Sequence, residues 1–228
     1  LFMATGLIRE EMTSGTMHFM IAKPIARSEI FLYRVLGYLG IVWPYIIVLG
    51  LLGALVSGFV GSGDEFFRFA DLGVWLAIVF ATMMATLVYG MMFNALGVLW
   101  KYGIILAIPF AAWELGMALL SMGVPDATIL RFSVIGWALM IVDSAAMLVW
   151  PSLDVFILMG DWGGGGTGSD IFGSSSLRGS GPLNFFSSKP GLGLSAFAST
   201  IVATLVLLVQ AVVFWFLGGV LFKGKEIQ

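Results

Sequence analysis

Residues 35–63 read VLGYLGIVWPYIIVLGLLGALVSGFVGSG, a stretch without a charged side chain. Residues 72–100 and 190–222 are equally free of charge. Each stretch exceeds the roughly 20 residues that a helix needs to cross about 30 Å of hydrocarbon. Because leucine, valine, isoleucine, alanine and glycine fill them without strict alternation, the pattern predicts helices and not barrel strands.

The composition of the whole chain agrees with these stretches. Hydrophobic residues make up 60% of it and charged residues 11%, and the mean hydropathy is +1.04. These values lie outside the range of soluble globular domains. We therefore expect an all-α fold, a polytopic helical membrane protein.

The order and orientation of the spans follow from charge. The expected spans lie at about 35–60, 73–99, 102–122 and 193–221. Most basic residues fall on one side if the opening polar segment, Lys101 and the C-terminal tail are cytoplasmic, as the positive-inside rule favours. This order leaves no crossing for residues 132–150, which carry Asp143 at their centre. We expect a re-entrant or outer-interface element there.

The rest of the chain divides around these spans. Residues 1–8 predict the cytoplasmic end of an incomplete span, because eight residues supply only about 12 Å of helix. Residues 9–34 are polar and predict a cytoplasmic coupling segment. The spans and the outer element occupy 35–150, and a Gly/Ser-rich extracytoplasmic loop occupies 151–192. The last span and the cytoplasmic tail occupy 193–228.

Two features inside the spans are candidates for a translocation path. Glu114 is an acid within the third span, and an intramembrane acid is costly and indicates function by default. It has two other interpretations, which are reaching the outer interface and pairing with a neighbouring helix. Gly50, Ala54 and Gly58 form a face of small residues on the first span. This face favours close helix packing, with the lining of a substrate path as the alternative.

The sequence lacks the residues that several kinds of metal or catalytic site require. The chain has no cysteine and one histidine, His18, so it offers neither thiolate ligands nor a histidine metal cluster. No triad, HExxH motif or set of paired carboxylates within the spans is present. We expect no metal, no cofactor and no enzymatic activity of its own. The net charge of −2 and the absence of a basic run argue against a nucleic-acid partner.

The opening segment carries a specific pattern. Glu10 and Glu11 are followed by Ser14-Gly15-Thr16, and residues 23–30 read KPIARSEI. At the other end, residues 222–227 read FKGKEI. Together these two ends resemble the permeases of type-2 ABC transporters. That family has six spans, cytoplasmic termini and an outer re-entrant element between the last two spans, so the resemblance implies that the first span and most of the second are missing here.

The resemblance also implies a mechanism. Such permeases pair as homo- or heterodimers in the plasma membrane and bind cytoplasmic ABC ATPase subunits, which hydrolyse ATP to drive export. The polar segment after the second span contacts the ATPase, because charges grip a soluble partner and glycine and proline turn the chain back. The residues that match this coupling interface are Glu10, Glu11, Gly15, Thr16, Pro24, Arg27 and Glu29.

Two alternatives stay open. A permease of the same fold can transmit motion to an extracytoplasmic partner without moving a substrate, and aromatic residues such as Trp162 and Phe172 in the loop at 151–191 fit such a partner. A structural or energy-converting subunit of a larger membrane complex is the other. Proton-pumping subunits usually place Lys, His or Glu at mid-membrane in several spans, and the first, second and last spans here carry none.

Overall fold

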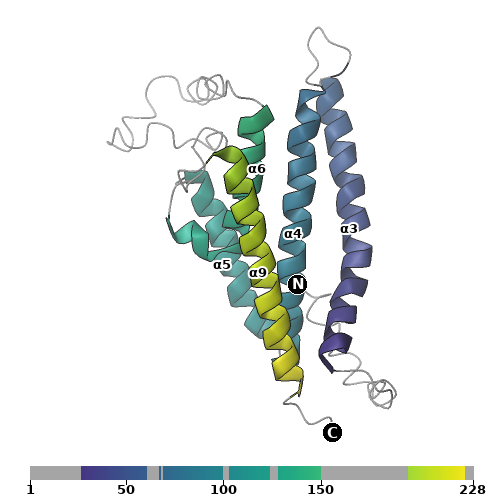
Figure 1. The fold of residues 1–228 in the computed structure, drawn as a ribbon, viewed down its shortest axis with the longest axis vertical. Coiled ribbons are helices and arrows are strands. Elements are labelled where there is room, and N and C mark those ends of the chain that lie inside the picture. The colour runs from purple at the N-terminus through teal and green to yellow at the C-terminus, as the bar shows by residue number, and fades with distance from the viewer. Residues whose placement is uncertain are drawn as a thin grey trace. The chain divides into compact units, whose positions relative to one another are not determined.

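The computed structural model describes residues 27–60, 67, 69–99, 103–123, 128–149 and 195–223. These residues form α3 (Arg27–Val60), α4 (Ala70–Leu99), α5 (Gly103–Gly123), the 3-10 helix η1 (Thr128–Phe132), α6 (Val134–Val149) and α9 (Ala196–Lys223) (Figure 1). No strand occurs in this part of the chain. The all-α expectation is confirmed. Glu10, Glu11, Gly15, Thr16 and Pro24 lie outside the described residues, as do the expected incomplete span and the outer loop.

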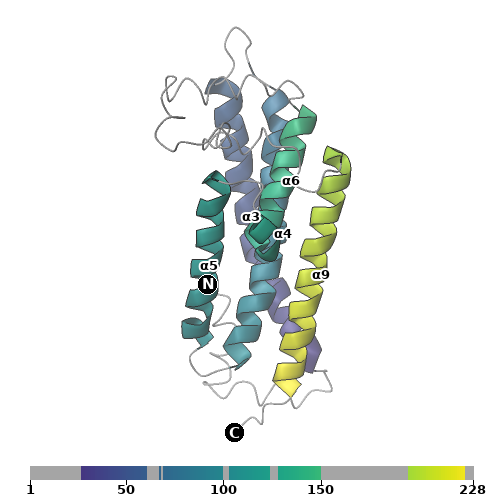
Figure 2. The ribbon, with the colours of Figure 1, turned by 90° about the vertical axis from the view of Figure 1, so that its left-hand side faces the viewer.

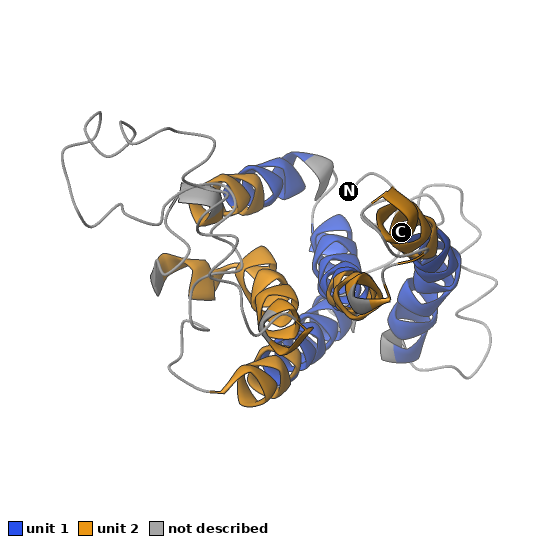
Figure 3. Ribbon diagram, turned by 90° about the horizontal axis from the view of Figure 1, so that it is seen from above, with its two compact units in different colours: residues 1–48, 82–113, 205–228 blue, residues 49–81, 114–204 orange. Residues whose placement is uncertain are grey.

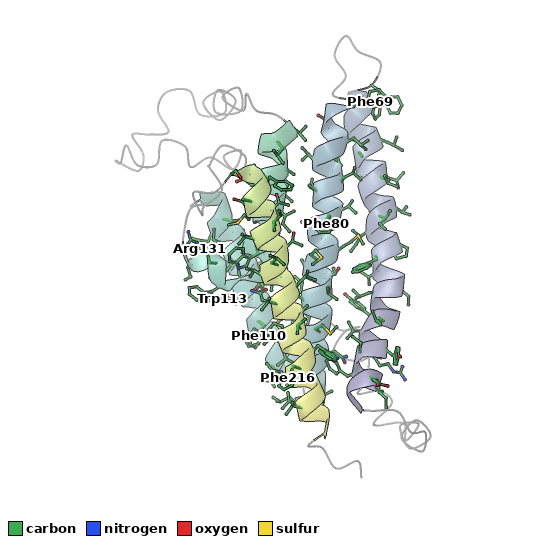
Figure 4. The ribbon with its side chains drawn as sticks, viewed as in Figure 1. Phe69, Phe80, Phe110, Trp113, Arg131 and Phe216 are labelled. Carbon is green, nitrogen blue, oxygen red and sulfur yellow. The ribbon has the colours of Figure 1, made fainter. Side chains whose placement is uncertain are left out.

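Among the described helices, three are long and apolar enough to cross a membrane, namely Glu29–Val60, Asp71–Leu99 and Ala196–Leu221. These helices carry many exposed large apolar side chains, and Figure 4 labels two exposed aromatic ones, Phe80 and Phe216. A soluble protein rarely leaves so much apolar surface to water, whereas hydrocarbon solvates it without cost. The chain is therefore compatible with a membrane-embedded protein.

The helix boundaries depart from the expected spans in two places. α3 begins at Arg27, eight residues before the expected start, because an exposed Glu29 and a partly buried Arg34 do not stop a helix that leaves the apolar layer. The apolar part of α5 is short, at Ile105–Ser121, so α5 is not among the three long apolar helices. The expectation of a full span at 102–122 therefore stays a prediction.

The chain divides into two compact units (Figure 3), and each is described by itself. Unit 1 comprises Leu1–Val48, Thr82–Trp113 and Leu205–Gln228. Unit 2 comprises Leu49–Ala81 and Glu114–Thr204. The long helices α3, α4 and α9 each contribute one part to unit 1 and the other part to unit 2, whereas η1 and α6 belong to unit 2 alone.

Unit 1 is held together where α3, α4, α5 and α9 pack on one another. The indole Nε1 of Trp43 on α3 donates to the carbonyl of Met83 on α4 at 3.2 Å. Met92 and Phe93 of α4 form a buried cluster with Ala107 of α5, against which Phe214 of α9 packs. These contacts bury apolar side chains from four helices. They stabilise unit 1 by joining segments that are far apart in the sequence.

In unit 2 the small-residue face of α3 meets α4. Gly50 lies against Val79 and Gly53 against the Trp75 ring, while Ala54 is 4% exposed. A side chain at either glycine would collide with these neighbours, so the glycines permit the close approach of the two helices. These direct contacts support the packing interpretation of this face.

The end of this α3–α4 pair carries a polar contact and an aromatic group. The hydroxyl of Ser57 donates to the carboxylate of Asp71 at 3.1 Å, and Asp71 lies in the first turn of α4, where a negative charge is favourable. Gly58 lies against the ring of Phe67, which makes edge contacts with Phe59 and Phe69.

Candidate functional site

The strongest polar arrangement in unit 2 is the start of α6. Ser133 separates η1 from α6 and is fully buried. Its hydroxyl accepts the backbone N–H of Gly136 at 3.0 Å and donates to the carbonyl of Leu130 at 2.8 Å. Serine is a preferred residue at this position because its side chain satisfies a first-turn N–H that no helical carbonyl can reach.

A carboxylate from α5 completes this start. Glu114 accepts the backbone N–H of Val134 through Oε1 at 3.1 Å and that of Ile135 through Oε2 at 3.0 Å. Both carboxylate oxygens therefore act on the first turn of a helix 20 residues further along the chain. The contact is favourable for two reasons. The hydrogen bonds are charge-assisted, and the N-terminus of the helix carries partial positive charge that attracts the carboxylate.

Every backbone N–H donor at this helix start has an acceptor. The N–H of Ser133 itself donates to the carbonyl of Leu130 at 3.1 Å. The four N–H groups that lack a helical partner are thus all bonded, two of them by Glu114. We call Glu114 and Ser133, together with the four N–H groups that they and Leu130 satisfy, the α6 cap. Because hydrocarbon offers no hydrogen bonds, such a helix start is suited to a position away from water.

The corner between η1 and α6 is closely packed. A side chain at Gly136 would run into the carbonyl group of Leu130 and the hydroxyl of Ser133, so only glycine fits there. The indole Nε1 of Trp137 donates to the carbonyl of Arg131 at 2.8 Å, and the Trp137 side chain is 8% exposed. Arg131 is labelled in Figure 4, where its side chain lies at the edge of the η1 ribbon.

The length of α6 bears on the expected re-entrant element. α6 has 16 residues, or about 24 Å of helix, which is less than the thickness of a hydrocarbon core. Figure 2 shows how short it is beside α3, α4 and α9. The expected element at 132–150 coincides with α6, and its re-entrant placement in a membrane stays a prediction.

The predicted site residues are distributed over different places. Glu114 belongs to the α6 cap, which corresponds to the interpretation that it pairs with a neighbouring helix. Gly50 and Ala54 belong to the α3–α4 packing, and a role of these residues in a translocation path stays a prediction. Arg27 and Glu29 begin α3, with Glu29 exposed. Asp143 lies in the second half of α6 and is partly buried.

Sequence reasoning did not single out Ser133 and Gly136. A signal for Ser133 was present, because serine directly before an apolar helical run is a typical helix start. No comparable signal tied that start to Glu114, since the two segments are joined only by the fold. Within the described ranges no group of three His, Cys, Asp or Glu residues could hold a metal ion.

The comparisons with known proteins give no family. No protein-family model, curated protein or solved structure matches this chain. The function has to be argued from the chain's own residues.

Proposed function

We propose that this chain is the transmembrane permease subunit of an ATP-binding cassette exporter of type-2 architecture. In this proposal it pairs with a second permease copy in the plasma membrane and binds cytoplasmic ABC ATPase subunits. The ATPases hydrolyse ATP, and the permease converts their closure into export of a substrate. The chain itself supplies no catalytic residue.

The observation that carries the proposal is the α6 cap. The permease family to which the two ends of the chain are similar has an outer re-entrant element between its last two spans. A re-entrant element starts inside the membrane region, where its first N–H groups must be satisfied by protein. Glu114 and Ser133 provide these partners for α6, a short helix between α5 and α9.

The continuity of α3 supports the coupling part of the proposal. α3 has 34 residues, or about 51 Å of helix, which exceeds the roughly 30 Å of a hydrocarbon core. Arg27 and Glu29 therefore lie on the same helix as the first long apolar segment. A displacement at residues 9–34 would therefore act directly on α3, which carries Pro44 in its interior.

The test is reconstitution with an ATPase subunit that carries a Walker motif and is encoded beside this chain. We expect the purified chain alone to hydrolyse no ATP, and the complex to hydrolyse ATP and to export a substrate from vesicles. Arg27→Ala should weaken association by about 1 kcal/mol, the worth of a rim contact. Arg27→Glu should weaken association further, because the reversed charge would repel the group on the ATPase that Arg27 attracts.

The matched control is Lys189→Glu, a charge reversal in the expected outer loop, which should leave association unchanged. If Arg27→Glu retains full association and full coupling, the proposal loses its support from the opening segment. If the complex couples hydrolysis to motion but exports nothing, the chain transmits force to an outer partner, and the export part of the proposal is wrong.

A further inference from the structure

Unit 1 contains a buried polar group that does not belong to the α6 cap. Asn94 on α4 is 0% exposed. Neither its Nδ2 nor its Oδ1 has a hydrogen-bond partner among the residues that the structure describes. An amide carries two donor hydrogens and an acceptor oxygen, and in Asn94 none of them is hydrogen-bonded within the described residues.

The contacts of unit 1 locate the Asn94 side chain. α3 and α4 run antiparallel, since Trp43 bonds to Met83 and Tyr38 and Val35 pack on Gly90. Asn94 follows Gly90 by one helical turn, and Phe31 precedes Val35 by one turn. The two therefore face each other across the α3–α4 contact.

α9 approaches the same point from a third side. Gly218 of α9 lies against the ring of Phe31, which is itself 0% exposed. We call this place, formed by Phe31, Asn94 and Gly218, the three-helix junction. Asn94 is thus enclosed by helices and does not face lipid.

A second polar side chain, Tyr38, packs on Gly90, one helical turn before Asn94. The ring edge of Tyr38 lies on Gly90, with Cε1 at 3.1 Å from the place of an added Cβ. Side chains of a helix lean toward its N-terminus, and on α3 this direction leads from Gly90 toward the level of Asn94. The Tyr38 hydroxyl is therefore carried toward the amide.

We propose that ordered water bridges the Asn94 amide and the Tyr38 hydroxyl at the three-helix junction. An unsatisfied buried amide costs about 1–3 kcal/mol in proteins and more in hydrocarbon, so the group needs a partner that both donates and accepts. Water does both, and a buried water commonly makes two to four hydrogen bonds.

The experiment is X-ray radiolytic labelling of the full chain in lipid nanodiscs, in which bound water generates radicals that oxidise neighbouring side chains. The reporter is Met91, which neighbours Asn94 on the helix at spacing i, i+3. The internal control is Met84, on the same face of α4 two turns earlier. Their exposures are matched at 5% and 7%. We expect Met91 to be oxidised several-fold faster than Met84.

Two variants make the result specific. Asn94→Leu keeps the branched side-chain shape and removes the amide, and Tyr38→Phe removes only the hydroxyl, so neither variant opens a large cavity. Each should lower the oxidation rate of Met91 to that of Met84. Equal rates for the two methionines in the unaltered chain would overturn the proposal, as would labelling of Met91 that persists in Asn94→Leu. Labelling that survives in Tyr38→Phe would overturn the bridge.

The inference is independent of the proposed transport function. The labelling needs no ATPase, no substrate and no second permease, so it can fail while the permease proposal stands. It can equally succeed if the chain belongs to another kind of membrane complex.

Discussion

α6 and α9 both begin directly after a serine in unit 2, yet the two helix starts differ. Ser195 is exposed, and among the described residues its hydroxyl meets one first-turn N–H, that of Ala198, at a long 3.4 Å. Ser133 is fully buried, and Glu114 shares the first turn of α6 with it. The start of α9 can use water for its other donors, whereas the start of α6 is satisfied by protein alone. The start of α6 therefore has no need of water as a hydrogen-bond partner, unlike the start of α9.

The largest effect should come from Glu114→Ala. This change leaves the N–H groups of Val134 and Ile135 without their acceptor at a partly buried position. Hydrogen bonds to a charged group are worth about 1.5–3 kcal/mol each, so we expect a loss of about 3 kcal/mol in stability. Thermal unfolding in nanodiscs, followed by the fluorescence of the chain's tryptophans, measures it.

Glu114→Gln tests how much the charge and the second acceptor oxygen of Glu114 contribute. The amide keeps one acceptor oxygen but loses the charge and the second acceptor, so the loss should be about half as large. Glu29→Gln, on an exposed side chain, is the matched control and should change the melting temperature little. If Glu114→Ala melts like Glu29→Gln, the α6 cap contributes no stability.

Gly136→Ala should have the next largest effect. The added methyl group meets the backbone carbonyl of Leu130, which cannot move aside as a flexible side chain could. Overpacking of this kind costs about 1–3 kcal/mol. Gly116→Ala on α5 is the control, because open space surrounds that position. There alanine should be neutral or stabilise by up to about 1 kcal/mol, the gain in helix propensity. Similar melting temperatures for the two variants would contradict the tight corner.

The smallest effect should come from the serines themselves. Ser133→Ala removes a buried cap and should cost about 1–2 kcal/mol. Ser195→Ala removes an exposed cap that water can replace and should cost about 0.5 kcal/mol or less. The two losses are compared by thermal unfolding under one condition. Equal losses would mean that burial does not distinguish the two helix starts.

The long helices were predictable because their only requirement is apolar length, which the sequence displays directly. Glu114 was also flagged, because an acid in an apolar stretch is costly wherever the chain places it. Pairing with a neighbouring helix was one of its interpretations, but its partners were not predictable, since the N–H groups that it binds lie 20 and 21 residues away. A local pattern cannot encode such a distance.

Two further features were not fully predictable from the sequence, for different physical reasons. Asn94 is one neutral polar residue in a long apolar run, so it barely changes hydropathy, and only packing reveals its burial. The expected span at 35–60 was bounded by charge, so it marks only the apolar part of α3, which begins at Arg27. A helix can leave the hydrocarbon and continue in water, where charged side chains are solvated.

The most direct test of the α6 cap is residue-resolved hydrogen exchange at the helix starts of α6 and α9 in the unaltered chain. First-turn amides normally exchange fast because they have no helical partner. We predict that the amides of Val134 and Ile135 exchange at least about tenfold more slowly than those of Ala196 and Phe197, which corresponds to about 1.4 kcal/mol of protection. Glu114→Ala should abolish the difference. Equal rates at the two starts in the unaltered chain would contradict the account.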